Sequence, residues 1–384
     1  MNFDYYLSRP DIGDRERAAV DSVLRSPELA LGPWTVRFEE LVRLRLGAAH
    51  AVAVNSGTSA LHLLVRAFGT RPGDEIVTTP FSFVASANAA LFEGARPIFA
   101  DIDETTFNLD PGAVERAIGP RTRAILAVHV FGLPCPMEEL AGIASRRGVP
   151  LIEDACEALG ATYRERPAGA IGAASTLAFY PNKQITTGEG GMVLTQDGEI
   201  ARLVRSMANQ GRESGAGWFD HVRMGYNYRM DEMSAALGAV QMERLDEILA
   251  ARSRVAASYR ARLAEIEGVR PLDDPPWATR SWFVHPVRLD RAYDRDRLAE
   301  GMARRRVQTA RYFPPIHLLP FYRDRFGHRP GDFPVTERVS ASLLALPFYN
   351  ALSDSDVAEI AGRLAEALAE GRRASATPGN PGPA

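Results

Sequence analysis

Three separate segments of the chain carry residue types that could together hold a reactive cofactor. Lys183 follows an apolar run and precedes a glycine-rich loop at residues 186–191. Asp154 ends another apolar run, and residues 55–59 lead from an apolar run into a helical pattern. A lysine amine condenses with aldehydes, a carboxylate keeps a pyridine nitrogen protonated, and amides at a helix start bind phosphate. The sequence therefore predicts a site for pyridoxal 5'-phosphate.

Residues 56–59 are the predicted phosphate seat. Gly57 would let the backbone approach a ligand closely. Thr58 and Ser59 would supply amide and hydroxyl donors at the positive end of a helix. Ser56 could equally be an ordinary helix N-cap, which is a common role of serine.

Two acids and one aromatic residue could complete the site. Asp154 would share a proton with the ring nitrogen in a charge-assisted hydrogen bond, although an acid here could instead cap a following helix. Glu157 lies three residues on and could reach the same ring if a helix begins here. Phe83 follows a predicted strand and could stack on the ring or pack in the core.

Lys183 taken alone would be interpreted as a solvated loop lysine. A lysine reacts as the neutral amine, which burial and nearby positive charge favour. The glycine-rich loop at 186–191 argues for a special environment, because such a loop requires unusual backbone angles or close approach.

The order of the elements predicts how these residues meet. Short apolar runs alternate with helical patterns from about residue 50 to 195, which indicates an α/β fold with a mostly parallel sheet flanked by helices. Ligands of such sheets bind at the carboxyl ends of the strands, where Asn55, Pro80, His129 and Asp154 are expected. The predicted strands are 51–54, 75–79, 96–100, 124–128, 150–153, 176–179 and 192–195, and the clearest helices are 59–68, 84–92 and 137–147.

The rest of the chain predicts a second, smaller domain. Residues 231–267 form one long helical pattern, with Asp231 as its N-cap and Gly268 after its end. A strand and two helices follow, at 281–288, 294–305 and 354–369.

We therefore expect two domains and a tail. Residues 1–250 would form the large cofactor-binding domain, with an N-terminal arm, and residues 251–372 a smaller C-terminal α+β domain. Residues 373–384 are mostly Pro, Gly, Ala and Ser with no apolar face, which predicts a disordered tail.

Composition narrows the class of protein. The 384 residues are 46% hydrophobic and carry a net charge of −3, so a sizeable core is expected and nucleic-acid binding is not. Cys135 and Cys156 are too few for a disulfide framework and match no zinc pattern, so no metal is expected. Residues 1–4 lack a signal-sequence pattern and no apolar run would span a bilayer, which predicts a cytoplasmic protein with no membrane partner.

In this order the motifs resemble those of the DegT/StrS nucleotide-sugar aminotransferases, within fold type I of the pyridoxal-phosphate enzymes. The resemblance runs from about residue 7 to 347. Five motifs in the expected order are much more specific than any one of them. They lie at residues 55–58, 153–155, 180–183, 186–191 and 225–229.

The resemblance implies a role for each candidate residue. Lys183 would bind the cofactor covalently and then move the proton, and Asp154 would pair with the pyridinium. Thr58 and Ser59 would bind the phosphate, and Phe83 would stack on the ring.

The segment 225–229 is the part that implies an assembly. In the family, the asparagine of this motif reaches the cofactor phosphate of the neighbouring subunit, so Asn227 implies a homodimer with shared active sites. Arg229 could donate to a phosphate or a carboxylate, although it could also be an exposed loop charge.

The implied reaction has two halves. Glutamate would give its amino group to the cofactor, and a nucleotide-linked keto-sugar would then accept it, with Lys183 moving the proton in both halves. Such a reaction makes amino sugars for antibiotics or surface polysaccharides. Analogy places substrate contacts near Arg311, for a diphosphate, Tyr312, and His317, for a sugar hydroxyl.

Two positions depart from the family pattern. Ala178 stands where many members have a serine that binds the phosphate, so that interaction would be missing or moved to Ser175 or a water. Glu157 stands where many have glutamine or histidine, and its carboxyl would have to be protonated or turned away from the ring. Lys183 itself argues against the dehydratase branch, which has histidine there.

Two other functions remain open. A protein of this fold could bind the cofactor as a regulator or sensor without transaminase activity, although no DNA-binding motif or basic face is evident. A lysine aldolase without pyridoxal is less consistent with the sequence, because Asp154 and the seat at 56–59 would have no function in it.

Overall fold

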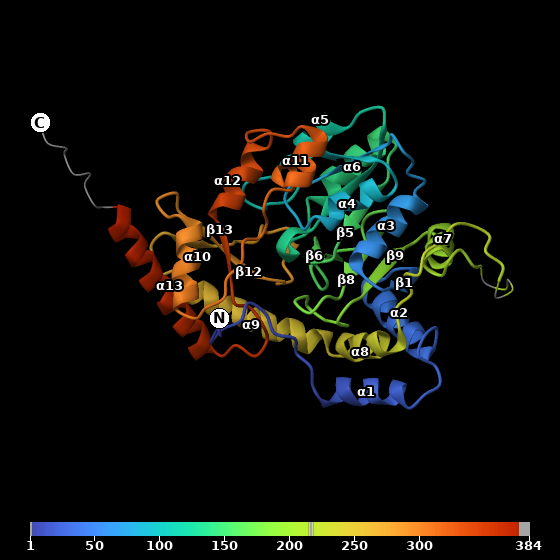
Figure 1. Ribbon diagram of the computed structural model, residues 1–384, viewed down its shortest axis with the longest axis horizontal. Helices are drawn as coiled ribbons and strands as arrows, with labels where there is room; N and C mark the ends of the chain where they lie inside the picture. Colours follow the sequence, from blue (N-terminus) through green and yellow to red (C-terminus); the bar gives the residue numbers. More distant parts are fainter. Residues whose placement is uncertain (1, 214, 216, 218, 376–384) are drawn as a thin grey trace, which may run out of the picture.

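The computed structural model describes residues 2–213, 215, 217 and 219–375, and its centre is a seven-stranded sheet (Figure 1). The strand order is β1-β9-β8-β5-β4-β2-β3. Strands from β8 to β3 pair in parallel, and β9 is antiparallel to β8 and β1. The prediction of a mostly parallel sheet is confirmed, and every predicted strand lies in it. The strands are β1 (His50–Val54), β2 (Glu75–Thr78), β3 (Arg96–Phe99), β4 (Thr122–Val128), β5 (Leu151–Asp154), β8 (Ala174–Ala178) and β9 (Gly191–Thr195).

Each face of the sheet is covered by its own helices. In β1, Ala51 and Ala53 pack in a cluster with Phe38 of α2, whereas Val52 and Val54 pack with α3 and α7. Alternate strand residues point to opposite faces, so a sheet covered on both faces needs apolar residues at every position. The strands therefore appear in the sequence as unbroken apolar runs. The helices are α2 (Pro33–Leu46), α3 (Gly57–Ala67), α4 (Ala85–Phe92), α5 (Pro111–Ala117), α6 (Met137–Arg147), α7 (Gly198–Ala208) and α8 (Glu232–Glu243).

The single long helix predicted over 231–267 is two helices. Asp231 caps α8 as predicted, since its Oδ1 accepts the Ser234 N–H at 2.9 Å. The backbone leaves helical geometry at Arg244 (φ −96°, ψ 7°), and α9 (Leu245–Leu263) follows. The Arg244 guanidinium donates to Glu16 at 2.6 Å, which ties this junction to helix α1 (Asp14–Leu24). A contact so distant in sequence leaves no trace in the local pattern.

A smaller α+β unit lies beside the large sheet (Figure 1). Its antiparallel sheet consists of β10 (Val269–Pro271), β12 (His285–Leu289) and β13 (Leu343–Leu346). Helices α9, α10 (Arg295–Arg304) and α13 (Asp354–Ser375) share its core. The two predicted helices are confirmed, and the predicted strand over 281–288 begins only at His285.

Segments near both ends of the chain contact the core on the opposite side of the predicted boundary at residue 250. Tyr5 pairs with Val307, and its hydroxyl donates to Glu359 at 2.7 Å, so the N-terminal arm packs on the small domain. In the other direction, Tyr322 of α11 (Pro320–Phe326) donates to Asn88 of α4 at 2.6 Å. Residue 250 itself falls inside α9. Segments from both ends of the chain therefore cross between the two cores.

The C-terminal helix extends further than expected. Helix α13 reaches Ser375, so residues 373–375 of the predicted disordered tail are helical, and residues 376–384 lie outside the described residues. Within the described ranges, no helix combines the length and apolar character of a membrane span. The remaining elements are α12 (Pro334–Ser342), η1 (Val130–Gly132), η2 (Ile316–Leu318), and a small sheet of β6 (Thr162–Tyr163), β7 (Arg166–Pro167) and β11 (Ala278–Thr279).

Candidate active site

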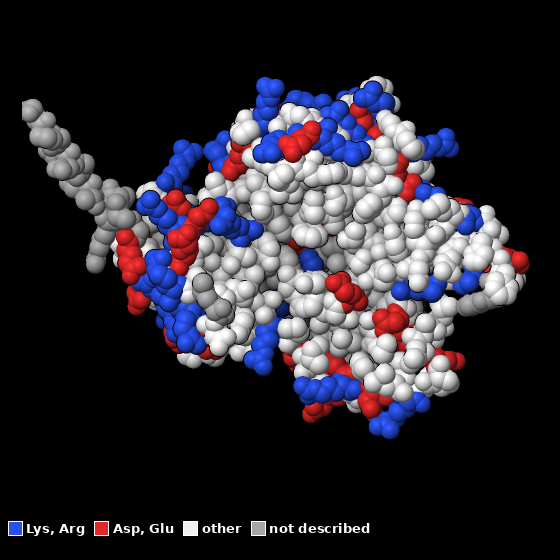
Figure 2. Space-filling view, viewed as in Figure 1, with Lys and Arg blue, Asp and Glu red and all other residues white. Residues whose placement is uncertain are grey.

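A cavity of about 460 Å³ lies where the carboxyl ends of the central strands meet the C-terminal part of the chain. Lys183, Asp154, Glu157, Thr58 and Phe83 all line it. Of the four residues expected at the strand ends, Asp154 lines the cavity, whereas Asn55, Pro80 and His129 do not. Figure 2 shows a hollow near the middle of one face, with basic atoms at its floor and a mostly uncharged surround. The C-terminal part of the chain contributes an aromatic wall of Phe283, Tyr312 and Phe313.

The loop that carries Lys183 has the two features that its glycines predicted. The Lys183 N–H donates to the Tyr180 carbonyl at 2.9 Å in a tight turn. Gly188 has a φ of +81°, which favours glycine. A Cβ at Gly191 would collide with the Ser56 carbonyl, so the loop lies directly against the phosphate seat.

Lys183 is buried and faces the cavity. Its side chain is only 12% exposed, which excludes the solvated-loop interpretation. The Nζ atom lies 4.0 Å from the centre of the Phe283 ring and 3.7 Å from Glu157 Oε1. It is also the only lysine in the chain, because 44 of the 45 lysine and arginine residues are arginine. A guanidinium stays protonated, so no other side chain offers a reactive amine.

Asp154 is held at both of its carboxylate oxygens. Ser86 Oγ donates to Oδ2 at 2.7 Å, and the Cys156 N–H donates to Oδ1 at 3.2 Å. The carboxylate ends strand β5 and lies on the cavity wall. It therefore suits the predicted role beside a pyridine nitrogen, and it caps only a short turn.

Glu157 is the second carboxyl of the cavity, and its side chain is 6% exposed. Burial raises the pKa of Glu157, although the charge of Lys183 and the N–H of Phe131 oppose this. That N–H lies 2.9 Å from Oε2, which leaves Oε1 to face Lys183. This direction of the pKa shift agrees with the expectation that a charged carboxyl would be unfavourable beside the ring.

We expect Glu157→Gln to make stability less dependent on pH in the cofactor-free protein. A raised pKa in the folded state gives stability that is fully present below the ordinary value of 4.5 and is lost as pH rises through the folded-state pKa. Glutamine keeps the acceptor for Phe131 and removes the titration. The thermal midpoint of the variant, relative to wild type, should therefore rise by a few degrees between acidic and neutral pH. A difference that is constant with pH would contradict this.

The segment 56–59 both caps a helix and contributes to the cavity lining, as the two interpretations of this segment predicted. Ser56 caps α3, since its Oγ accepts the Ser59 N–H at 3.1 Å, and Thr58 lines the cavity. The Ser59 hydroxyl donates to Asn55 Oδ1 at 2.7 Å, so its proton is already used in that hydrogen bond. Ser59 also does not line the cavity. A Cβ at Gly57 would lie 2.7 Å from the Ala178 Cβ, which shows how closely this turn approaches β8.

Ser175 does not replace the serine missing at Ala178. Its Oγ donates to the Gly169 carbonyl at 2.6 Å and is fully buried behind the cavity. Ala178 itself lines the cavity.

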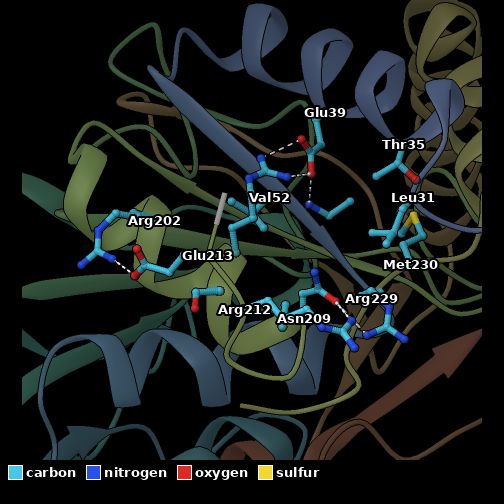
Figure 3. Close-up of a pocket in the computed structure, with 14 residues that line it drawn as sticks. Leu31, Thr35, Glu39, Val52, Arg202, Asn209, Arg212, Glu213, Arg229 and Met230 are labelled. Carbon is cyan, nitrogen blue, oxygen red and sulfur yellow. Dashed lines mark hydrogen bonds and ion pairs between the residues drawn. The ribbon is translucent and has the colours of Figure 1, made fainter. Parts of the chain in front are cut away.

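Asn227 and Arg229 lie outside the cavity of their own chain. Asn227 is exposed, and its backbone pairs with Asn209. Arg229 donates to Asn209 Oδ1 at 3.0 Å in a second cavity of about 310 Å³ beside the edge strand β1. Figure 3 shows this cavity, where Arg202 pairs with Glu213 on the far side from Arg229.

Two predicted substrate residues are placed elsewhere by the fold. His317 is fully buried, and its Nε2 lies 3.1 Å from Glu337, so it is not available to a sugar in the cavity. Arg311 is exposed and pairs with Asp296 at 3.2 Å, outside the cavity. Tyr312 does line the cavity. His129, expected at the strand ends, is fully buried and bonds Glu153 at 2.9 Å instead.

Several cavity residues were not predicted. Phe283 and Ser86 are two of them, and a third, Cys156, lies between Asp154 and Glu157. Of these three, only Ser86 could have been found from the sequence, because it lies on the predicted helix 84–92, three residues after Phe83. Asn182 also lines the cavity, and its buried Oδ1 has no hydrogen-bond partner among the described residues.

The residues present fit pyridoxal 5'-phosphate. One cavity holds a lone buried amine, an oriented carboxylate, an exposed aromatic ring at Phe83, and a glycine turn at a helix start. The buried Asn182 oxygen still requires a donor. Lys183 would bind the aldehyde carbon, Asp154 the ring nitrogen, and Thr58 the phosphate.

Comparison with known proteins agrees with this geometry. GDP-perosamine synthase of Caulobacter vibrioides is 37% identical over 343 residues, or 88% of this chain and 91% of that protein. The structure of DesI in the presence of its TDP-sugar product has a TM-score of 0.90 and 33% identity, covering 98% of this chain and 96% of that one. The putative sugar aminotransferase Spr1654 from Streptococcus pneumoniae in its PLP form has a TM-score of 0.90 and 25% identity, covering 96% and 99%.

The model of the DegT/DnrJ/EryC1/StrS aminotransferase family matches residues 10–365, which is most of the chain. Together with the lysine, carboxylate and phosphate seat in one cavity, this match shows that the chain belongs to that family, the pyridoxal-phosphate-dependent sugar aminotransferases of fold type I.

Proposed function

We propose that this enzyme moves an amino group from glutamate to a nucleotide-linked keto-sugar. The observation that carries the proposal is that the largely buried Lys183 side chain and the Asp154 carboxylate line one cavity, which has an aromatic wall. The relatives support the acceptor, because one is named for a GDP-linked sugar and another was solved with a TDP-sugar product.

Asp154 and Lys183 have different roles in the proposed reaction. The cofactor, when bound, supplies a ring that absorbs the electron pair released at the substrate carbon. Asp154 holds the ring nitrogen proton, oriented by its two hydrogen bonds. Lys183 Nζ takes the proton from the substrate carbon and returns it one position away.

The half-reaction with glutamate tests the donor. We expect L-glutamate to bleach the visible band of the cofactor-loaded protein and to release about one 2-oxoglutarate per site, because only an α-proton reachable by Lys183 can be moved. D-glutamate serves as the matched control and should do neither. Bleaching by another amino acid but not by L-glutamate would identify a different donor. A spectrum that no amino acid changes would favour the regulator.

We propose further that the active unit is a homodimer in which each site uses Asn227 of the other chain. In support, Asn227 is exposed and does not line the cavity of its own chain, and Ala178 offers no hydroxyl to the phosphate. Two-fold dimers are the commonest oligomers.

Mixing two inactive variants tests the shared site. Lys183→Ala and Asn227→Ala chains should regain activity when mixed, since one site of each mixed dimer keeps both residues. The recovered activity should approach about a quarter of wild type, because half of the dimers are mixed and each has one intact site of two. Chain exchange is verified with differently tagged chains. No recovery after verified exchange, with Asn227→Ala alone impaired, would refute sharing.

A further inference from the structure

Among the described residues, Ser86 is the one side chain from another element that forms a hydrogen bond with the Asp154 carboxylate. It is the second residue of helix α4, is 3% exposed, and lines the cavity. Its Oγ lies 2.7 Å from Asp154 Oδ2. A hydroxyl has one proton to donate, and the partner is an acceptor when ionised, so Ser86 is the donor.

A second hydroxyl stands behind Ser86. Ser82 Oγ lies 3.3 Å from Ser86 Oγ and 3.0 Å from the Phe83 carbonyl. Both serines are buried. The segment that positions the predicted stacking ring, Phe83, is therefore connected through hydroxyls to the carboxylate on the facing strand.

The remaining contacts of Asp154 make its orientation depend on Ser86. The opposite oxygen, Oδ1, accepts the Cys156 N–H at a longer 3.2 Å. The hydrogen bond from Ser86 is the shorter of the two. Ser86 also lies at the N-terminal, positive end of α4, which favours negative charge on the carboxylate.

We propose that Ser86 is a positioning residue that fixes the Asp154 carboxylate toward the cofactor's ring nitrogen and moderates how strongly that carboxylate competes for the ring proton. This inference rests on the role given to Asp154 in the proposed function. A carboxylate without its hydroxyl donor becomes a stronger base and is free to turn about its last bond. The proton is then held less on the ring and more on Asp154.

The nitrogen resonance of the bound cofactor measures this directly. The protein is loaded with pyridoxal phosphate labelled with ¹⁵N in the ring, without amino acid or sugar. In Ser86→Ala we expect the ¹⁵N shift to move toward the unprotonated value, and the glutamate half-reaction to slow about tenfold, the effect of losing a hydrogen bond to a charged group. Ser82→Ala, which removes the next hydroxyl but keeps the Ser86–Asp154 hydrogen bond, should change both much less than Ser86→Ala does.

Each outcome decides the proposal. A wild-type ¹⁵N shift in folded Ser86→Ala overturns it, even if activity falls, because a merely structural role would not move the ring proton. If Ser86→Ala does not fold, Ser86→Cys keeps the bulk with a weaker donor, and a wild-type shift there overturns it equally. The ¹⁵N measurement needs no substrate, so a failure of the proposed glutamate reaction would leave it unaffected.

Discussion

Replacing Lys183 with alanine is expected to lower amino transfer by more than about a thousandfold, because it removes both the covalent attachment and the proton carrier. The chain has no second lysine to substitute for it. The fold should survive within about 1 kcal/mol, since the lysine amine lies 3.7 Å from Glu157 and 4.0 Å from the centre of the Phe283 ring and fills no part of a hydrophobic core. Single-turnover rates measure the loss of amino transfer, and thermal unfolding measures the retained stability.

Lys183→Arg is the matched control for charge. It keeps a cation beside Glu157 and Phe283 but offers no amine that condenses with an aldehyde. Both variants should be equally inactive. Substantial turnover in either one would show that Lys183 is not the reactive amine.

Asp154→Asn should lower turnover by about 100- to 1,000-fold, the usual cost of removing one oriented electrostatic partner from an active site. Asparagine no longer offers an anion to the ring nitrogen, so the ring becomes a poorer electron acceptor. Cofactor binding should persist, because Thr58, Phe83 and Lys183 are unchanged. Turnover with saturating substrates and the dissociation constant for the cofactor separate these two effects.

A variant that binds the cofactor and turns over near the wild-type rate would remove Asp154 from the mechanism. Loss of cofactor binding itself would instead give Asp154 a holding role. Circular dichroism of the variant confirms that the comparison is made on folded protein.

The sequence predicted the parts of the molecule that local patterns specify. Strands covered on both faces are apolar at every position, so every strand of the main sheet could be located. The strand-end rule correctly placed Asp154 at the cavity, although Asn55, Pro80 and His129 do not line it. The uniqueness of Lys183 was available from the sequence and is its strongest single signal.

What the sequence did not predict depends on contacts between distant residues. The break at Arg244 is fixed by Glu16, more than 200 positions away. Phe283 joins the cavity only because the small domain docks on the large one. His317 appeared suited to a substrate, yet Glu337 holds it in a buried pair, and burial lowers its pKa. Local sequence patterns carry no information about which distant side chain fills such a position.

Borohydride reduction of the cofactor-loaded protein, followed by peptide mass spectrometry, tests the central claim most directly. Reduction makes the bond between cofactor and amine permanent, so the modified peptide identifies the residue. The structure predicts label on the peptide containing Lys183, at about one per chain, and none on the Lys183→Arg variant. Label on the amino terminus alone, or an unlabelled Lys183 in fully loaded protein, would contradict the account.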